Sequence, residues 1–181
     1  MSQELGSAKD PSSSDTDTTE PEVVLSSEQK RVVDCIMQGR NVFYTGSAGS
    51  GKSAILRAFI KQLKAMGKQV VVTAPTNLAA LNVGDVTTFS YAGWNPKTNE
   101  DSIGLMIEKL IGKEKHKTIA SHFQETDVLV IDEIIMLESN AFRRLNVLMK
   151  YARDSSEPFG GVQIFVTGDV RDSLCFHIRS C

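Results

Sequence analysis

One eight-residue segment of the chain has residue types and spacing suited to holding a phosphate chain: Gly46, Ser47, Ala48, Gly49, Ser50, Gly51, Lys52 and Ser53. It matches the pattern G-x-x-x-x-G-K-[ST] at every fixed position. The glycines let the backbone curl so that its N–H groups point inward at an anion. Lys52 can reach the outer phosphates, and the Ser53 hydroxyl can bind Mg²⁺. The segment therefore predicts a nucleoside triphosphate site.

The residues on either side of this loop fit a strand before it and a helix after it. Residues 41–45 are β-prone, and Gly67 is expected to end the helix. The apolar residues at helical spacing are Ile55, Phe59, Leu63 and Met66. The alternative is a glycine-rich turn without a ligand. Such a turn would not need this strand–loop–helix order, so phosphate binding is the preferred interpretation.

Two carboxylates follow another apolar run, residues 128–131. Asp132 can hold Mg²⁺ opposite the phosphate loop, and Glu133 can orient and polarise an attacking water. Two carboxylates at a buried strand end are costly without a cation, which favours a functional role. A later run ends in Thr167-Gly168-Asp169, a position where a γ-phosphate can be sensed.

Gln29 precedes the phosphate-loop strand, in a helix that is expected to begin after Ser26 and to end at Gly39. Ser26 and Gln29 have the spacing of a capping box. The Gln29 amide can also present a donor and an acceptor to adenine. The residues alone leave both roles open.

Four β-prone runs alternate with helical stretches: residues 41–45, 69–74, 128–131 and 162–166. Apolar, β-branched runs are typical of strands covered on both faces. The alternation predicts an α/β fold with a parallel sheet flanked by helices. Ligands then bind at the carboxyl ends of the strands, where every motif above falls.

Small hydroxyl and aromatic residues follow the second run. The candidates for stacking on bases or bonding to phosphates are Thr76, Asn77, Phe89, Tyr91 and Trp94. The same aromatic residues can instead face a core or anchor a loop. Composition alone favours the core.

Composition limits the remaining possibilities. A chain of 181 residues fits about one domain, and 41% hydrophobic residues are enough for a core. The formal net charge of −2 means that any nucleic-acid surface must be a local patch. The three cysteines and three histidines show no disulfide or metal spacing, and no run approaches the roughly 18 apolar residues of a membrane span. Residues 1–22 are expected to be disordered.

Taken together, five segments resemble the superfamily-one 5′-to-3′ DNA helicases, and most closely their petite-integration-frequency (PIF) branch, relatives of RecD. In chain order they read GSAGSGKS, TAPTNLAALN, TTFSYAGW, VLVIDEIIM and PFGGVQIFVTGD. The phosphate loop alone is unspecific, whereas the TAPT and PFGG-to-TGD segments make the resemblance specific. It covers about residues 25–169. The expected organisation is a polar tail over 1–22, a RecA-like phosphate-loop NTPase domain over 23–169 and a divergent tail over 170–181.

The resemblance implies the first motor domain of an ATP-dependent helicase, with ATP and Mg²⁺ as cofactors. It implies that Gln29 contacts adenine, and that Lys52 and Ser53 contact phosphate and Mg²⁺. It implies that Asp132 binds the metal and that Glu133 orients water. It also implies roles in DNA repair, recombination and telomere maintenance, in the nucleus or the mitochondrion.

For the DNA-binding candidates, the resemblance reverses the preference for a core. It implies that Thr76, Asn77 and the aromatic residues between Phe89 and Trp94 lie near single-stranded DNA. Three positions depart from the family pattern: Ile135 replaces a serine, Phe89 a histidine and Asp172 a glutamine.

A second motor domain and its arginine finger have no counterpart in these 181 residues, so we expect the chain alone to bind ATP without unwinding DNA. Two alternatives stay open. One is another phosphate-loop ATPase, and the other is a non-catalytic nucleotide-binding module.

Overall fold

The fold is described from a computed structural model, over residues 24–47, 49–83, 86–95, 101–112 and 114–169. The tails expected over 1–22 and 170–181 lie outside these ranges. The α-helices are α1 (Ser27–Met37), α2 (Lys52–Ala65), α3 (Asn77–Val83), α4 (Thr88–Tyr91), α5 (Ile103–Gly112), α6 (Glu114–Glu125) and α7 (Ser139–Ala152). The strands are β1 (Val42–Thr45), β2 (Val70–Ala74), β3 (Val86–Thr87), β4 (Val128–Ile131) and β5 (Gln163–Gly168), and two 3₁₀ helices are η2 (Ile134–Met136) and η3 (Pro158–Gly161).

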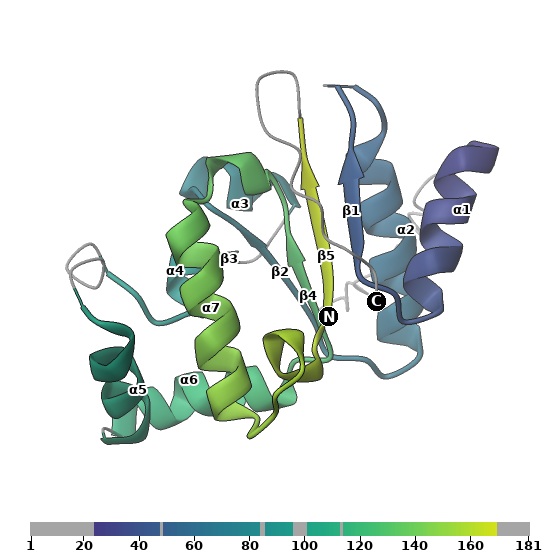
Figure 1. Cartoon of the computed structure of the whole chain (residues 1–181). Coiled ribbons are helices and arrows are strands. Elements are labelled where there is room, and N and C mark those ends of the chain that lie inside the picture. Colours follow the sequence, from purple (N-terminus) through teal and green to yellow (C-terminus); the bar gives the residue numbers. More distant parts are fainter. Residues whose placement is uncertain (1–23, 48, 84–85, 96–100, 113, 170–181) are drawn as a thin grey trace, which may run out of the picture.

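The described strands form one sheet in the order β1-β5-β4-β2-β3, and every pair in it is parallel. Their carboxyl ends lie along one edge of the sheet, at the top of Figure 1, beside α3. The predicted α/β fold with a parallel sheet is confirmed. The edge strand β3 was not predicted, because two residues are too short to give a periodic pattern.

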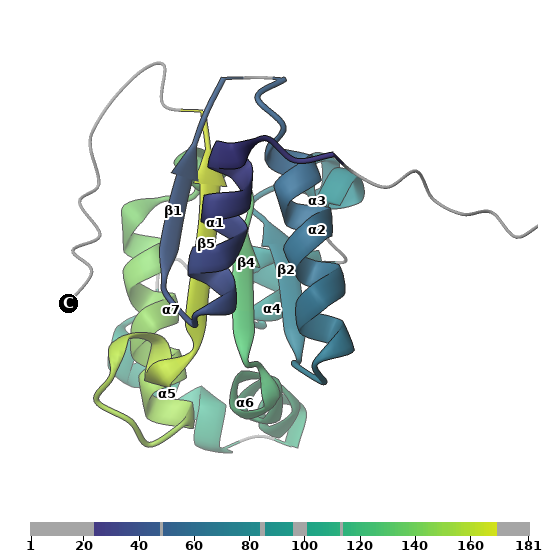
Figure 2. The same ribbon diagram turned by 90° about the vertical axis from the view of Figure 1, so that its right-hand side faces the viewer.

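Helices cover both faces of the sheet, with α1 and α2 on one face and α7 on the other, where α5 and α6 pack against α7 (Figures 1 and 2). Consecutive strand residues point to opposite layers. Val128 and Val130 pack with α1 and α2, whereas Leu129 and Ile131 pack in the cluster that contains α7. Burial on both faces explains why this strand is apolar at every position.

Most predicted helix boundaries are confirmed, and two details are wrong. Gly67 has φ 77 and follows the last turn of α2, as a helix-ending glycine should. Met66, however, is 63% exposed, because it lies at the carboxyl end of α2 instead of on its buried face. The sequence also offers Ser139 or Asn140 as the cap of the helix after the acidic pair, but α7 begins at Ser139 and its N-cap residue is Glu138, so neither of them caps it. Within the described ranges, no helix is long and apolar enough to cross a membrane.

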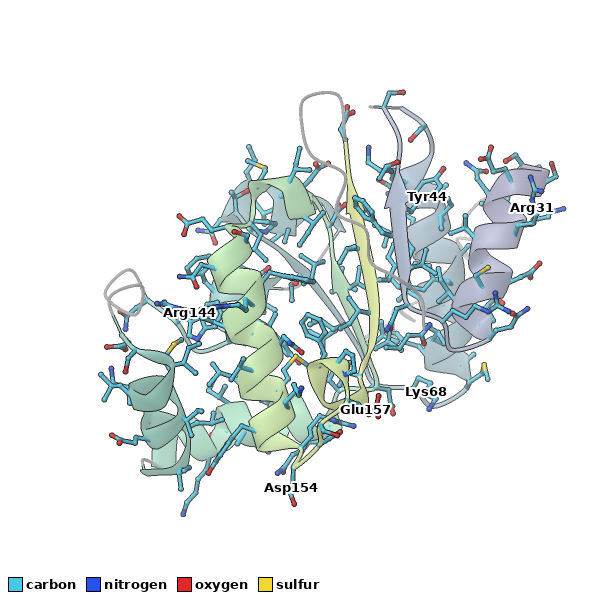
Figure 3. All side chains as sticks on the ribbon, viewed as in Figure 1. Arg31, Tyr44, Lys68, Arg144, Asp154 and Glu157 are labelled. Atoms are coloured by element: carbon cyan, nitrogen blue, oxygen red, sulfur yellow. The ribbon has the colours of Figure 1, made fainter. Side chains whose placement is uncertain are left out.

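Arg153, the C-cap residue of α7, joins this helix by hydrogen bonds to backbone segments at the amino edge of the sheet. Its guanidinium donates to four backbone carbonyls, those of Gly160 (2.8 Å), Phe123 (2.8 Å), Gln124 (2.6 Å) and Thr126 (3.2 Å). Lys68 and Asp127 form an ion pair of 3.6 Å at the same edge. Figure 3 shows Lys68 at this lower edge, and Tyr44 of β1 higher up, toward the opposite edge. Structural contacts thus occupy the amino edge, and the candidate site lies at the carboxyl edge.

Candidate nucleotide and nucleic-acid site

The phosphate loop connects β1 to α2 at the carboxyl edge of the sheet. Lys52 Nζ donates hydrogen bonds to the carbonyl oxygens of Gly46, at 2.7 Å, and Ser47, at 3.4 Å. The ammonium is therefore held against the loop. Among the described residues no side chain caps the amino end of α2, so its first N–H groups and its dipole can meet an anion. Ala48, the remaining loop residue in the predicted set, lies outside the described residues.

Two glycines of the loop stand where a side chain would not fit. Gly51 has φ 83, and a Cβ there would collide with Gln29 Nε2. A Cβ on Gly46 would collide with Ser50 Oγ. That hydroxyl is buried and has no hydrogen-bond partner in the described part of the chain. Buried polar groups are seldom left unpaired, so this orphaned hydroxyl fits a loop whose bonding a phosphate completes.

Gln29 connects α1 to the phosphate loop. Its Oε1 accepts from the backbone N–H of Ser26 at 2.8 Å, and Ser26 Oγ accepts from the backbone N–H of Gln29 at 3.2 Å, which completes the predicted capping box. Its Nε2 donates to the carbonyl oxygen of Ser50 at 3.3 Å. The capping role is confirmed, and the same side chain also braces the loop.

Asp132 and Glu133 lie directly after β4. Asp132 is 8% exposed, and its Oδ1 accepts from Thr167 Oγ1 and from the backbone N–H of Glu133, the latter at 3.0 Å. Glu133 has φ 50 and ψ 46, a left-handed conformation that is uncommon for a residue with a side chain. Such conformations persist where the surrounding structure imposes them, often at functional sites. The turn places the half-buried Glu133 directly after the buried Asp132.

Strand β5 connects the phosphate loop with the acidic pair, because it lies between β1 and β4 in the sheet. On one side, the carbonyl oxygen of Gly168 accepts from the backbone N–H of Gly46 at 3.4 Å. On the other side, Thr167 donates to Asp132. The carboxyl end of β5 therefore contacts both halves of the candidate site.

The oxygens at this edge suit Mg²⁺. Asp132 supplies a buried carboxylate, and Ser53 supplies an exposed hydroxyl in the first turn of α2. Mg²⁺ needs only one or two protein ligands where phosphate oxygens supply others. A site with this donor set fits a Mg²⁺–nucleotide complex better than the metal alone.

The candidate DNA-binding residues lie on the far side of the sheet from β1. Thr76 and Asn77 follow β2 at the start of α3; Asn77 is exposed, and Thr76 Oγ1 accepts from the backbone N–H of Ala79 at 3.2 Å. The rings of Phe89 and Trp94 meet edge to face with centroids 5.7 Å apart. Both are half-buried and keep part of their surface exposed.

Tyr91 does not fit the role implied for it. Its ring is 5% exposed and packs edge to face on Phe123, and its hydroxyl lies 2.9 Å from Thr126 Oγ1. Burial raises the pKa of Tyr91 to about 12. A ring enclosed in this way cannot stack on a base, so the core interpretation is the correct one for Tyr91.

Buried threonine hydroxyls hold strands β2 and β4 and helix α4 together beneath the site, outside its binding and catalytic groups, and the sequence pattern did not reveal them. Thr88 Oγ1 donates to Thr73 Oγ1 at 3.2 Å, and Thr73 Oγ1 donates to the carbonyl oxygen of Val130 at 3.0 Å. The backbone N–H of Asp132 donates to the carbonyl oxygen of Thr73 at 2.9 Å. In sequence these threonines are indistinguishable from ordinary β-prone residues. Among the departures from the family pattern, Ile135 is 54% exposed and Asp172 lies outside the described residues.

A family model described as PIF1-like helicase matches residues 24–177, which extends past Asp169. ATP-dependent DNA helicase PIF1 of Candida albicans is 40% identical over 148 residues, and ATP-dependent DNA helicase RRM3 of Saccharomyces cerevisiae is 40% identical over 150 residues. Both alignments cover 81% of this chain, but it spans only 16% and 20% of the length of these relatives.

Solved structures agree with this match. The crystal structure of Pif1 helicase from Candida albicans has a TM-score of 0.74 and 40% identity, covering 81% of this chain and 33% of that one. A structure of Pif1 helicase from Bacteroides, in complex with ADP-AlF3 and single-stranded DNA, has a TM-score of 0.66 and 31% identity, covering 81% and 32%. The RecA-like fold is thereby confirmed.

Proposed function

Because this chain belongs to the PIF1-like helicase family, we propose that it forms the ATP-binding motor domain of a 5′-to-3′ DNA helicase. One observation carries the proposal: the carboxyl end of β5 contacts both the phosphate loop, through Gly168, and the acidic pair, through Thr167. A loop built for phosphates and a carboxylate suited to Mg²⁺ thus belong to one site, as ATP hydrolysis requires.

ATP binding in this proposal uses the loop and its lysine. Lys52 exchanges its hydrogen bonds to the carbonyls of Gly46 and Ser47 for contacts to the outer phosphates. The exchange is favourable because an ammonium bonds more strongly to an anionic oxygen than to a neutral carbonyl. When the Gln29 amide binds adenine, it gives up its hydrogen bond to the Ser50 carbonyl or to the Ser26 N–H. Nucleotide binding is thereby linked to the start of α1.

Hydrolysis in this proposal uses the acidic pair. Asp132 and Ser53 would hold Mg²⁺, which when bound would supply positive charge to the phosphate oxygens. Glu133, whose carboxylate is half-buried, orients the attacking water and accepts its proton. Its backbone N–H donates to Asp132 Oδ1, so the Asp132 carboxylate is held against the backbone of Glu133.

Single-stranded DNA in this proposal lies across the β2–β3 side of the sheet. Asn77 and Thr76 contact the phosphates, and Phe89 and Trp94 offer ring surface for stacking on bases. Tyr91 contributes only indirectly, by holding α4 in the core. The cellular setting that follows is DNA repair, recombination and telomere maintenance in the nucleus or the mitochondrion.

Binding of a fluorescent ATP analogue, followed by ATPase assays with and without single-stranded DNA, tests the proposal. Wild-type protein should bind ATP only weakly without Mg²⁺, and DNA should stimulate turnover. Lys52→Ala should weaken ATP binding by at least tenfold, because it removes a charge that contacts the phosphates. Lys61→Ala, on the exposed face of the same helix, is the matched control and should bind like wild type.

The outcomes separate the motor domain from its two rivals. Turnover that DNA does not change would indicate another kind of phosphate-loop ATPase. Nucleotide binding without turnover, with or without DNA, would indicate a non-catalytic module. Equal ATP affinity in folded Lys52→Ala and in wild type would contradict the site itself.

A further inference from the structure

Thr167 is a fully buried side chain that donates its hydroxyl hydrogen to a carboxylate. It is 0% exposed, next to last in β5, and its Oγ1 donates to Asp132 Oδ1. Ile131 pairs with Val166 in the register of β4 and β5, so the next residues along the two strands, Asp132 and Thr167, come face to face. The contact follows directly from the parallel register.

The hydrogen bonds to Asp132 are distributed unevenly between its two oxygens. Oδ1 accepts both from Thr167 and from the backbone N–H of Glu133, whereas no hydrogen bond to Oδ2 is found among the described residues. An oxygen that accepts two hydrogen bonds is poorly placed to bind a cation as well. The carboxylate is therefore oriented so that Oδ2 is the oxygen available to a metal.

We propose that Thr167 is a positioning residue for the metal-binding carboxylate of Asp132, an inference that rests on the proposed Mg²⁺–ATP site. Groups that hydrogen-bond to a metal ligand fix its orientation, and their loss typically reduces metal affinity 10–100-fold. Thr suits this role because its branched Cβ restricts χ1, so the hydroxyl is held in one direction before the metal arrives.

The position of Thr167 also gives it a link to the phosphate loop. Its neighbour Gly168 accepts from Gly46, and Thr167 itself pairs with Tyr44 of β1. A shift of the phosphate loop that moves the end of β5 therefore also moves Asp132, because the Thr167 hydroxyl is hydrogen-bonded to it. Thr167 consequently acts on metal binding through Asp132 and has no direct contact with the nucleotide in the proposal.

The test is a Mg²⁺ titration of the binding of a fluorescent, non-hydrolysable ATP analogue, a readout that does not depend on turnover. Thr167→Val removes the hydroxyl with little change in shape, and it should raise the half-saturating Mg²⁺ concentration about 10–100-fold. Analogue binding in EDTA should stay within about twofold of wild type, since only the metal ligand is affected. Thr167→Ser keeps the donor and should restore most of the Mg²⁺ affinity.

Thr73→Val is the matched control. Thr73 is also 0% exposed and also lies in the sheet, but its hydroxyl donates to the carbonyl oxygen of Val130 and not to Asp132. It should lower stability without changing the Mg²⁺ requirement. Should Thr167→Val fail to fold, as judged by thermal melting, Thr167→Ala is measured against the same criterion.

The experiment distinguishes failure of the positioning role from failure of the proposed function. An unchanged Mg²⁺ requirement in a folded Thr167 variant that lacks the hydroxyl would overturn the positioning role and leave the proposed function standing. An equal shift in Thr73→Val would overturn it too, because the effect would then be one of general stability. Mg²⁺-independent binding by wild type would overturn both the inference and the proposed function.

Discussion

Replacing Tyr91 by Phe tests whether this ring belongs to the core or to a DNA-binding surface. The hydroxyl of Thr126 donates to the carbonyl oxygen of His122 at 2.7 Å, so the Tyr91 hydroxyl is the donor in the 2.9 Å contact with Thr126. Tyr91→Phe removes one hydrogen bond and leaves the Thr126 hydroxyl with its other partner. At neutral pH we expect the variant to be less stable by about 1 kcal/mol.

The pH dependence of this difference is the sharper prediction. Burial raises the pKa of Tyr91 to about 12 in the folded protein, from its ordinary value of 10.0 in the unfolded chain. Below pH 10 the phenol is neutral in both states, and its contribution to stability is fully present. Between pH 10 and pH 12 the unfolded chain loses the proton while the folded protein keeps it, so wild type loses stability as the pH rises.

The expected loss is about 1.4 kcal/mol by pH 11, from the two pKa values. This loss is similar in size to the stabilisation that the Tyr91 hydrogen bond provides at neutral pH. The curves of unfolding free energy against pH for wild type and Tyr91→Phe should therefore cross near pH 11. Urea unfolding followed by circular dichroism, at intervals from pH 8 to pH 11, measures both curves. Lysines and other tyrosines titrate in both proteins and cancel in the difference. Parallel curves over this range would show that the Tyr91 hydroxyl reaches solvent, and the core placement would be wrong.

Three further predictions concern the remaining parts of the domain. Glu133→Gln keeps the backbone bond to Asp132, so ATP affinity should change by less than about threefold, while turnover falls about 10²–10⁴-fold; a variant that hydrolyses ATP at the wild-type rate would exclude Glu133 as the base. Trp94→Ala should weaken binding of single-stranded DNA roughly 5–150-fold in a filter-binding assay, and added salt should weaken the binding that remains; unaltered affinity in a folded variant would assign the ring to structure alone. Arg153→Met leaves several backbone carbonyls without their hydrogen-bond donor, so it should lower the free energy of unfolding by about 3 kcal/mol with unchanged ATP affinity. A free energy of unfolding within about 0.5 kcal/mol of wild type would contradict a stabilising role for Arg153.

The sequence by itself determined the features that depend on local spacing. The phosphate loop, the capping box of Ser26 and Gln29 and the helix-ending Gly67 are set by residues within a few positions of one another, so chain order suffices to find them. The parallel sheet was also predictable, because strands buried on both faces need apolar residues at every position. The carboxyl-edge location of Lys52 and Asp132 follows from that topology.

Only the tertiary structure decided which partners these residues have. The register between β4 and β5 brings Thr167 to Asp132 across 35 positions of sequence, and no local pattern encodes a register. Burial separated Tyr91 from Phe89 and Trp94, which the sequence had grouped together, because α4 turns Tyr91 toward Phe123 and leaves the other two rings partly exposed. A threonine or tyrosine carries the same chemistry at any position. Its role depends on which groups the fold places within hydrogen-bonding distance. Tertiary packing decides this, and the spacing of residues along the sequence does not.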